Sequence, residues 1–419
     1  MRSTILGTVL CIVAAVASAA DSVSSIESKS THRQATTIKL ADDAPTINAF
    51  CLNAQGEIVA VCGSGPGELL IIDDSGEVTK NWEVDVKPEA VNVRPDGTLL
   101  VAGEGKLFHY DRSGKLLKTA TSPHAARLKS DDEELRKSAI ASLKQRGGRS
   151  MVEARVKSYK SLIEQLEKMS ELRELTEAEK STLQAISDLN ERYTLQLEAM
   201  GDDDEEKGPT EEAIQQQIDV LIRSKMRISS VCSSADAVFV TTRALSGYGY
   251  DVWKTGADLS GGEIIIEGLR GCCGQMDVQC CQRGLFVAEN SADRVVHYDF
   301  DGTKITQWGK SDRTGIDGFG SCCNPMNVCF DGSGHVYTAE ASLGRIKKFD
   351  ATGNLIDFIG DVDLVPGCKN VSIAVSPVND NIYMLDLTRN HIVIMQPKTA
   401  SDTVKRTAAL ETGARDNEQ

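Results

Sequence analysis

Gly271-Cys-Cys-Gly-Gln-Met-Asp-Val278 is repeated about fifty residues later as Ser321-Cys-Cys-Asn-Pro-Met-Asn-Val328. The two copies continue alike, because Leu285-Phe-Val-Ala-Glu289 is matched by Val336-Tyr-Thr-Ala-Glu340. An internal repeat of this length indicates a fold built from similar supersecondary units that pack against their neighbours. The repeat therefore sets the architecture before any single residue is interpreted.

Strand patterns of period two, separated by Asp-Gly and similar turns, recur on both sides of a different central segment. They divide the chain into six units, which span residues 46–84, 87–121, 227–266, 269–308, 319–359 and 364–396. The last unit shows only three strands, and we expect Thr36-Thr-Ile-Lys-Leu40 to supply its fourth and close a ring. The sequence thus predicts an all-β, six-bladed β-propeller.

Four short phrases stand out in the fifth unit: Asn324-Pro-Met-Asn-Val328, Gly334-His-Val-Tyr-Thr-Ala-Glu340, Gly344-Arg-Ile346 and Phe349-Asp-Ala-Thr-Gly353. They resemble NHL repeats, the units of one family of six-bladed β-propellers. The resemblance covers mainly residues 269–397, is weaker in 46–121 and 227–266, and departs from the family where Glu289 and Glu340 replace the usual Asp. It implies the fold but little about function, because propellers serve as enzymes, scaffolds and binding modules alike.

Residues 128–226 interrupt the strand pattern with helical periodicity. Apolar residues alternate at spacings of four and three, as in a coiled-coil seam, at Val152, Val156, Tyr159, Ile163 and Leu166. Thr176 and Glu179 form a capping box before a second apolar stripe, and the acidic run 202–206 ends that helix. We expect an inserted α-helical coiled-coil hairpin that packs on itself; a dimerisation or partner-docking arm is the alternative.

The first 19 residues have the layout of a secretory signal peptide, with Arg2, an apolar run and the small-residue site Ala17-Ser18-Ala19. We therefore expect a secreted or periplasmic protein. Residues 20–35 are predicted to be a flexible linker and 398–419 a polar tail, which leaves 36–127 and 227–397 for the propeller. No other apolar run approaches the roughly 18 residues of a membrane-spanning helix. The net charge of −15 argues against a nucleic-acid partner.

Cysteines and carboxylates recur at equivalent positions of blades four to six when the blades are laid in register. Cys272, Cys322 and Cys368 stand just before the innermost strand, and Cys273 and Cys323 directly follow two of them. Glu289, Glu340 and Asp386 stand at the end of the second strand, which faces the same side of a propeller. We therefore expect a loop face of blades four to six that carries thiols and carboxylates together.

Three interpretations of these five cysteines stay open. Disulfides persist in an exported protein, and eleven cysteines (12 − 1) follow the signal peptide, so that at least one thiol stays unpaired or binds a metal. In the second interpretation the thiolates bind a soft transition metal or an iron–sulfur cluster. Adjacent cysteines fit one metal poorly unless further ligands come from another blade. In the third they are small packing residues.

A polar residue recurs along the first strand of five blades, at Asn48, Asn92, Ser229, Asp277 and Asn327. Because innermost strands line the channel of a propeller, these side chains are expected to hydrogen-bond with water there, with ligand binding as the alternative. His391 occupies the place that Arg294 and Arg345 hold in sister blades, and it is the histidine kept as a candidate site residue. His109 and His297 occur on third strands and are expected to be structural.

These patterns favour a module that binds a protein or small-molecule ligand on the loop face of blades four to six. Asn48, Asn92, Asp277, Asn327, Asp386 and His391 are the candidate ligand-binding residues. The rival is a metal- or iron–sulfur-dependent redox or lyase-type enzyme on the same face, with Glu289 or Glu340 as the general base. A third interpretation is a homo-oligomer assembled through the helical insertion.

Overall fold

The computed structural model describes residues 29–41, 44–130, 132–147, 149–173, 175–199, 210–313, 315–320, 323–365, 367 and 371–399. The predicted signal peptide, Cys322, Cys368 and most of the predicted tail lie outside these ranges. Within them the chain divides into two compact units, one of residues 1–126 with 225–419 and the other of 127–224. Each unit is described separately below.

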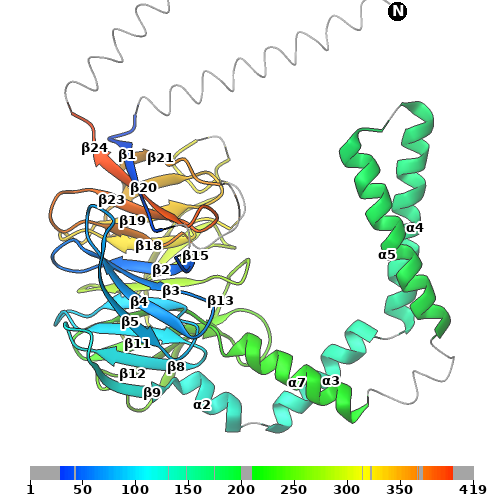
Figure 1. The fold of residues 1–419 in the computed structure, drawn as a ribbon, viewed down its shortest axis with the longest axis horizontal. Coiled ribbons are helices and arrows are strands. Elements are labelled where there is room, and N and C mark those ends of the chain that lie inside the picture. The colour runs from blue at the N-terminus through cyan, green and yellow to red at the C-terminus, as the bar shows by residue number, and fades with distance from the viewer. Residues whose placement is uncertain are drawn as a thin grey trace, which may run out of the picture. The chain divides into compact units, whose positions relative to one another are not determined.

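The larger unit contains six antiparallel sheets of four strands each (Figure 1). Five of the sheets are each built from four strands that are consecutive in the chain. The first two sheets are β2(Ile47–Leu52), β3(Ile58–Cys62), β4(Gly67–Ile72) and β5(Val78–Val84), and then β6(Ala90–Val93), β7(Leu99–Gly103), β8(Lys106–Tyr110) and β9(Leu116–Thr121). The next three are β10(Ile228–Ser233), β11(Ala237–Arg243), β12(Tyr250–Gly256) and β13(Glu263–Leu269); β14(Asp277–Cys281), β15(Gly284–Glu289), β16(Arg294–Tyr298) and β17(Lys304–Trp308); and β18(Asn327–Phe330), β19(Val336–Glu340), β20(Arg345–Phe349) and β21(Leu355–Asp361). The innermost strands of these five sheets, β2, β6, β10, β14 and β18, contact one another in that order. Both β18 and β2 also contact β22(Ile373–Val375), the innermost strand of the sixth sheet. The six sheets therefore form a closed ring, as predicted.

The sixth sheet joins the two ends of the propeller. Its order is β1-β24-β23-β22, with β22(Ile373–Val375), β23(Ile382–Asp386), β24(His391–Pro397) and the N-terminal strand β1(His32–Lys39). The pairing of β1 with β24 runs from His32 opposite Pro397 to Lys39 opposite His391. The predicted closing strand is thus present, and it begins earlier than the expected Thr36.

Hairpin turns in most blades share one carboxylate-centred geometry. In the β4–β5 turn, Asp73 Oδ1 accepts hydrogen bonds from the amides of Ser75 and Glu77, each at 3.0 Å. Asp350 accepts from the amides of Thr352 and Asn354 in the same way, at 2.8 and 3.0 Å. Such Asp side chains satisfy backbone donors that would otherwise lack a partner, so the recurring Asp-x-Ser/Thr-Gly pattern encodes the turns.

The core lies between neighbouring sheets, which pack face to face. Phe286 of β15 contacts Phe330 of β18 edge-on, with 5.1 Å between ring centroids, and Trp308 of β17 contacts Phe349 of β20 at 6.2 Å. His297 stacks on Phe286 at 4.1 Å, and its Nε2 lies 2.9 Å from the carbonyl of Arg283. This packing orients each sheet edge-on to the ring axis, so that the first strands line the centre.

The smaller unit is helical. Its helices are α3(Asp132–Gly147), α4(Arg149–Leu172), α5(Glu177–Ala199) and α7(Glu211–Lys225), whose last residue lies in the larger unit, as does the beginning of α2(Pro123–Ser130). Helices α4 and α5 contact each other where Tyr159 stacks on Tyr193, with 5.8 Å between ring centroids. The Thr176 capping box is formed, since the amide of Thr176 donates to Glu179 at 2.9 Å. None of the described helices combines the length and apolar character needed to cross a membrane.

Candidate functional site

Three cysteine sulfurs from two blades meet before strands β14 and β18. The Sγ atoms of Cys272 and Cys273 are 3.5 Å apart, and those of Cys273 and Cys323 are 3.3 Å apart. All three sulfurs lie within 4.8 Å of one another. Cys272 is half-buried, Cys273 is exposed and Cys323 is buried, so the cluster reaches from the inter-blade core to the surface. We call these three residues the thiol cluster.

Local backbone geometry places the sulfurs of the thiol cluster. The amide of Cys272 donates to Asn290 Oδ1 at 2.7 Å, and the amide of Gln275 donates to the carbonyl of Cys272 at 3.1 Å. Asn290 is fully buried and also donates from Nδ2 to the carbonyl of Gln275 at 3.2 Å. Cys273 and Cys323 have positive φ, at 55° and 65°, a conformation uncommon for a residue with a Cβ. Asn290 thus holds the turn that directs Cys273 toward Cys323.

The spacing of the thiol cluster suits thiolate coordination of a metal ion. Tetrahedral thiolate sites with metal–sulfur bonds of about 2.3 Å place their sulfurs about 3.8 Å apart. The separations of 3.3 and 3.5 Å lie near this value and far above the roughly 2.05 Å of a disulfide bond. Soft thiolate donors select metals such as zinc or copper(I). Because the ligands come from two blades, the adjacency of Cys272 and Cys273 is no obstacle to a shared ion.

The carboxylates of Glu289 and Glu340 lie buried in ion pairs. Arg294 Nε contacts Glu289 Oε2, and the amide of Arg270 donates to Glu289 Oε1 at 2.9 Å. Lys347 Nζ lies 2.6 Å from Glu340 Oε1, with both side chains fully buried. A general base must reach a substrate proton, whereas these oxygens are committed to neighbouring cations and amides. The geometry therefore argues against the catalytic role considered for both residues.

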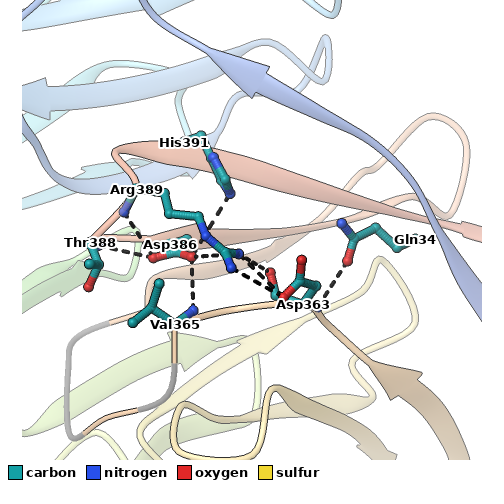
Figure 2. A network of polar contacts seen from close by, with 7 residues as sticks. All are labelled: Gln34, Asp363, Val365, Asp386, Thr388, Arg389 and His391. Atoms are coloured by element: carbon teal, nitrogen blue, oxygen red, sulfur yellow. Dashed lines mark hydrogen bonds and ion pairs between the residues drawn. The ribbon is translucent and has the colours of Figure 1, made fainter.

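The equivalent residue of the sixth sheet, Asp386, has the same structural role (Figure 2). Its Oδ2 accepts from the amide of Val365 at 3.0 Å, as Glu289 accepts from Arg270 and Glu340 from the amide of Gly320. Each carboxylate thus links the end of a second strand to the segment that enters its own blade. Glu289, Glu340 and Asp386 therefore hold equivalent positions in their blades. They act there as structural links and do not form an open charged face.

His391 lies beside Asp386 without a hydrogen bond to it. The distance from His391 Nε2 to Asp386 Oδ2 is 4.0 Å, and Arg389 Nη1 lies 3.4 Å from the same carboxylate oxygen (Figure 2). Burial lowers the pKa of His391, with the Asp386 charge opposing the effect. Arg389 also donates to the carbonyl of Asp363 at 3.0 Å. The neutral, buried imidazole is therefore part of the packing around this ion pair.

A polar ring at the centre of the propeller links successive blades. Val278 donates its amide to Ser230 Oγ at 3.0 Å, and Val328 donates to Asp277 Oδ2 at 2.9 Å. The amide of Val371 donates to Asn327 Oδ1 at 3.2 Å. The same side chains line a cavity of about 40 Å³. They therefore join the first strand of one blade to that of the next and leave space on the order of one water molecule.

Asp277 is the ionisable side chain of this ring from blade four. Asp277 is buried, and its burial raises its pKa to about 6. Hydrogen bonds from Val328, Gln279 and Asn327 oppose this shift because they stabilise the carboxylate. Gln279 Nε2 donates to Asp277 Oδ1 at 2.8 Å. Asp277 and Asn327 are thus brought together as predicted from their shared register.

Asn48 and Asn92 do not share the position of Asp277, which corrects the predicted register. Asn48 Nδ2 donates to the carbonyls of Gly63 and Pro88 at 2.6 and 2.8 Å. Asn92 Oδ1 accepts from Ser233 Oγ at 2.9 Å. A bulge between Ile47 and Ala49 and another between Ile228 and Ser230 shift the pairing, so Ala49 and Ser230 line the cavity at this position.

The remaining described cysteines lie in or against the core. Cys62 and Cys232 are buried in it, while Cys51, Cys280, Cys281 and Cys329 are half-buried and pack against it. Burial raises the pKa of Cys51 and of Cys62 to about 12, which keeps both as neutral thiols. Cys322 and Cys368 lie outside the described residues, so their place relative to the thiol cluster stays a prediction.

The fold and these inter-blade links define the class of the protein as a six-bladed β-propeller. No model of a known protein family matches the chain, and comparison with curated proteins gives no match. Solved propeller-like structures do resemble it: a gluconolactonase from Xanthomonas campestris (10% identity, TM-score 0.45, 88% of this chain and 95% of that chain) and virginiamycin B lyase from Staphylococcus aureus (8%, 0.41, 87% and 99%). Regucalcin, a calcium-binding protein from Agrobacterium tumefaciens, is similar at 13% identity and a TM-score of 0.44, over 87% of this chain and 93% of that chain. These likenesses are too remote to carry an argument about ligand or activity.

Proposed function

We propose that this chain is an exported, NHL-like propeller that binds a soft metal ion through Cys272, Cys273 and Cys323. The observation that carries the proposal is the convergence of three sulfurs from two blades within 4.8 Å. Three thiolates leave a coordination position for a further ligand, as in metal sites that exchange ligands. The proposed module therefore uses the metal as the point at which it binds a partner or small molecule.

The same geometry supports a binding module over the redox or lyase-type enzyme. Glu289 and Glu340, which end the second strands of blades four and five, are held in buried ion pairs. Among the described residues, no His side chain joins the three sulfurs of the thiol cluster as a further metal ligand. An iron–sulfur cluster usually has four cysteine ligands, one more than the described cluster supplies. We therefore place the function in binding, with catalysis as an outcome that the test below detects.

The test is a titration of anaerobically purified, reduced protein with Cd²⁺, followed by thiolate-to-metal charge transfer in the ultraviolet. We expect one equivalent to bind, and we expect Cys323→Ser to weaken binding at least tenfold because it removes a ligand from the second blade. Cys281→Ser is the matched control, since Cys281 belongs to another Cys-Cys pair outside the cluster. Equal binding by the two variants, or a wild-type protein that binds no Cd²⁺ when reduced, would refute the proposal. Iron with visible charge-transfer bands in the protein as purified would favour the enzyme.

A further inference from the structure

Cationic side chains gather around the thiol cluster although the chain as a whole carries a net charge of −15. Arg227 immediately precedes β10, and Arg243 ends β11. The connections that carry them belong to the third blade and lie on the same loop side as the turn Cys272–Gly274 of the fourth. Cationic side chains therefore lie on the loop side that carries the thiol cluster.

Two guanidinium groups lie over the turn that follows Cys273. A Cβ atom built on Gly274 would lie 3.0 Å from Nη2 of Arg243 and 3.9 Å from Nη1 of Arg227. Gly274 has a φ of +73°, so glycine both adopts this turn and leaves room for the guanidinium of Arg243. Both arginines therefore reach the rim of the thiol cluster.

Tyr250 connects these groups to the cluster. Its ring lies against Gly271, because a Cβ there would be 2.4 Å from Cε2 of Tyr250. Burial raises the pKa of Tyr250; Arg243 and Arg227 act to lower it, and Cys272 acts to raise it. The buried ring of Tyr250 thus packs against the residue that precedes Cys272.

Arg227 keeps donors available for a ligand. Its side chain is 56% exposed, and its Nε lies 3.4 Å from Glu89 Oε1. The other oxygen of Glu89 accepts from the amides of Ile228 and Glu104, at 2.9 and 3.2 Å, so this carboxylate is largely committed to backbone. A guanidinium has five N–H donors in a planar fork that matches a carboxylate. The pairing with Glu89 therefore engages Nε of Arg227, while Nη1 lies near Gly274 of the cluster turn.

We propose that the ligand completing the metal site is an anionic thiol, whose sulfur binds the metal while its carboxylates bind Arg227 and Arg243. This inference rests on the proposed metal binding by the thiol cluster. A divalent ion with three thiolates carries a charge of −1, and a dicarboxylate ligand bound through its thiolate brings the total to −4. The two guanidinium groups neutralise the two carboxylates of that ligand. On binding, the ligand thiol releases its proton to solvent and its sulfur donates an electron pair to the metal, so no oxidant or reductant is consumed.

The test uses protein loaded with one equivalent of Cd²⁺ and titrated calorimetrically with mercaptosuccinate, a dicarboxylate thiol, or with uncharged monothioglycerol. We expect wild-type protein to bind mercaptosuccinate about tenfold more tightly, because two partly exposed ion pairs are worth roughly 1.4 kcal/mol together. Arg227→Gln with Arg243→Gln should abolish this preference, whereas Arg243→Lys should retain part of it. Arg283→Gln, in the β14–β15 turn at the other end of the strands, is the matched control.

The outcomes separate the two proposals. A preference that the double variant loses and the control keeps supports the anionic-thiol site. Cadmium-loaded protein that binds both thiols equally, or whose preference survives in the double variant, overturns this inference and leaves metal binding intact. Protein that takes up no Cd²⁺ overturns metal binding itself and the inference with it. Succinate that binds as tightly as mercaptosuccinate would also overturn the assignment, since the sulfur would then contribute nothing.

Discussion

Replacing Lys347 by Met removes the cation from a fully buried ion pair of blade five. Lys347 Nζ lies 2.6 Å from Glu340 Oε1, and its ammonium also contacts the carbonyl of Gly318 and the ring of Phe319, at 5.3 Å from the centroid. At 2.6 Å the Coulomb energy is about 6 kcal/mol for an effective dielectric constant of about 20. Measured costs of removing one partner of a buried pair are about 3–5 kcal/mol. We therefore expect Lys347→Met to lower the free energy of unfolding by about 4 kcal/mol at pH 7.

The cost should depend on pH in a defined direction. Burial raises the pKa of Glu340 above its ordinary 4.5, and Lys347 opposes that shift. Without Lys347 the pKa rises further, so the folded variant binds a proton that the unfolded chain releases between pH 4.5 and the new value. Stability of the variant then falls as pH rises through this window. The gap between wild type and variant should consequently be smaller at pH 5 than at pH 7.

Urea unfolding followed by circular dichroism at the two pH values measures this gap. Lys348→Met is the control, because the neighbouring lysine is 19% exposed and lies 3.3 Å from the partly exposed Asp331, and we expect it to cost about 1 kcal/mol or less. Adding Glu340→Gln to Lys347→Met should recover part of the loss, since it removes the uncompensated charge. A loss below about 1 kcal/mol for Lys347→Met, or a gap that widens at low pH, would refute the reasoning.

Three further changes have expected outcomes. Burial lowers the pKa of His124 to about 4, so stability should fall as pH drops from 6.5 toward 4, and His124→Asn should remove that dependence in unfolding measured across this range. Burial raises the pKa of Asp277 from 3.8 to about 6, so wild type should lose about 3 kcal/mol as pH rises through this window; an Asp277→Asn variant with the same slope would contradict the assignment. Gly114→Ala would place its Cβ 1.8 Å from Trp82 and should lower the melting temperature far more than Gly247→Ala, which has open space.

The blades were predictable because local signals agreed with the global fold. Asp-x-Ser/Thr-Gly turns and period-two strands marked the sheets, and the missing fourth strand of the last blade required a partner from the N-terminal end. The equivalence of Glu289, Glu340 and Asp386 also followed from the repeat. Their structural role could not be predicted from the repeat. The cations that pair with these carboxylates, and the backbone amides that donate to them, are set by tertiary packing and not by sequence spacing.

The polar ring shows why strand register is harder to predict than strand existence. A single extra residue before Ala49 or Ser230 turns every following side chain to the other face, and the bulges that contain it have no distinct composition. Asn48 was therefore assigned to the position of Asp277 wrongly. Asn92 was assigned two residues too far along β6, which has no bulge and in which Ala90 holds that position. Arg227 and Arg243 were missed for a related reason: the third blade departs most from the repeat, and their approach to Gly274 arises from tertiary structure.

The pairing of β1 with β24 has a consequence for biosynthesis. The strand that completes the sixth sheet emerges from the ribosome first, and its partner, residues 391–397, emerges among the last. A contact between residues more than 350 positions apart carries a large loop-closure entropy and slows folding. The sixth sheet, and with it the ring, therefore cannot close until translation is nearly finished. The order of the strands thus delays closure of the ring, and if the chain is exported as proposed, this delay would keep it competent for translocation.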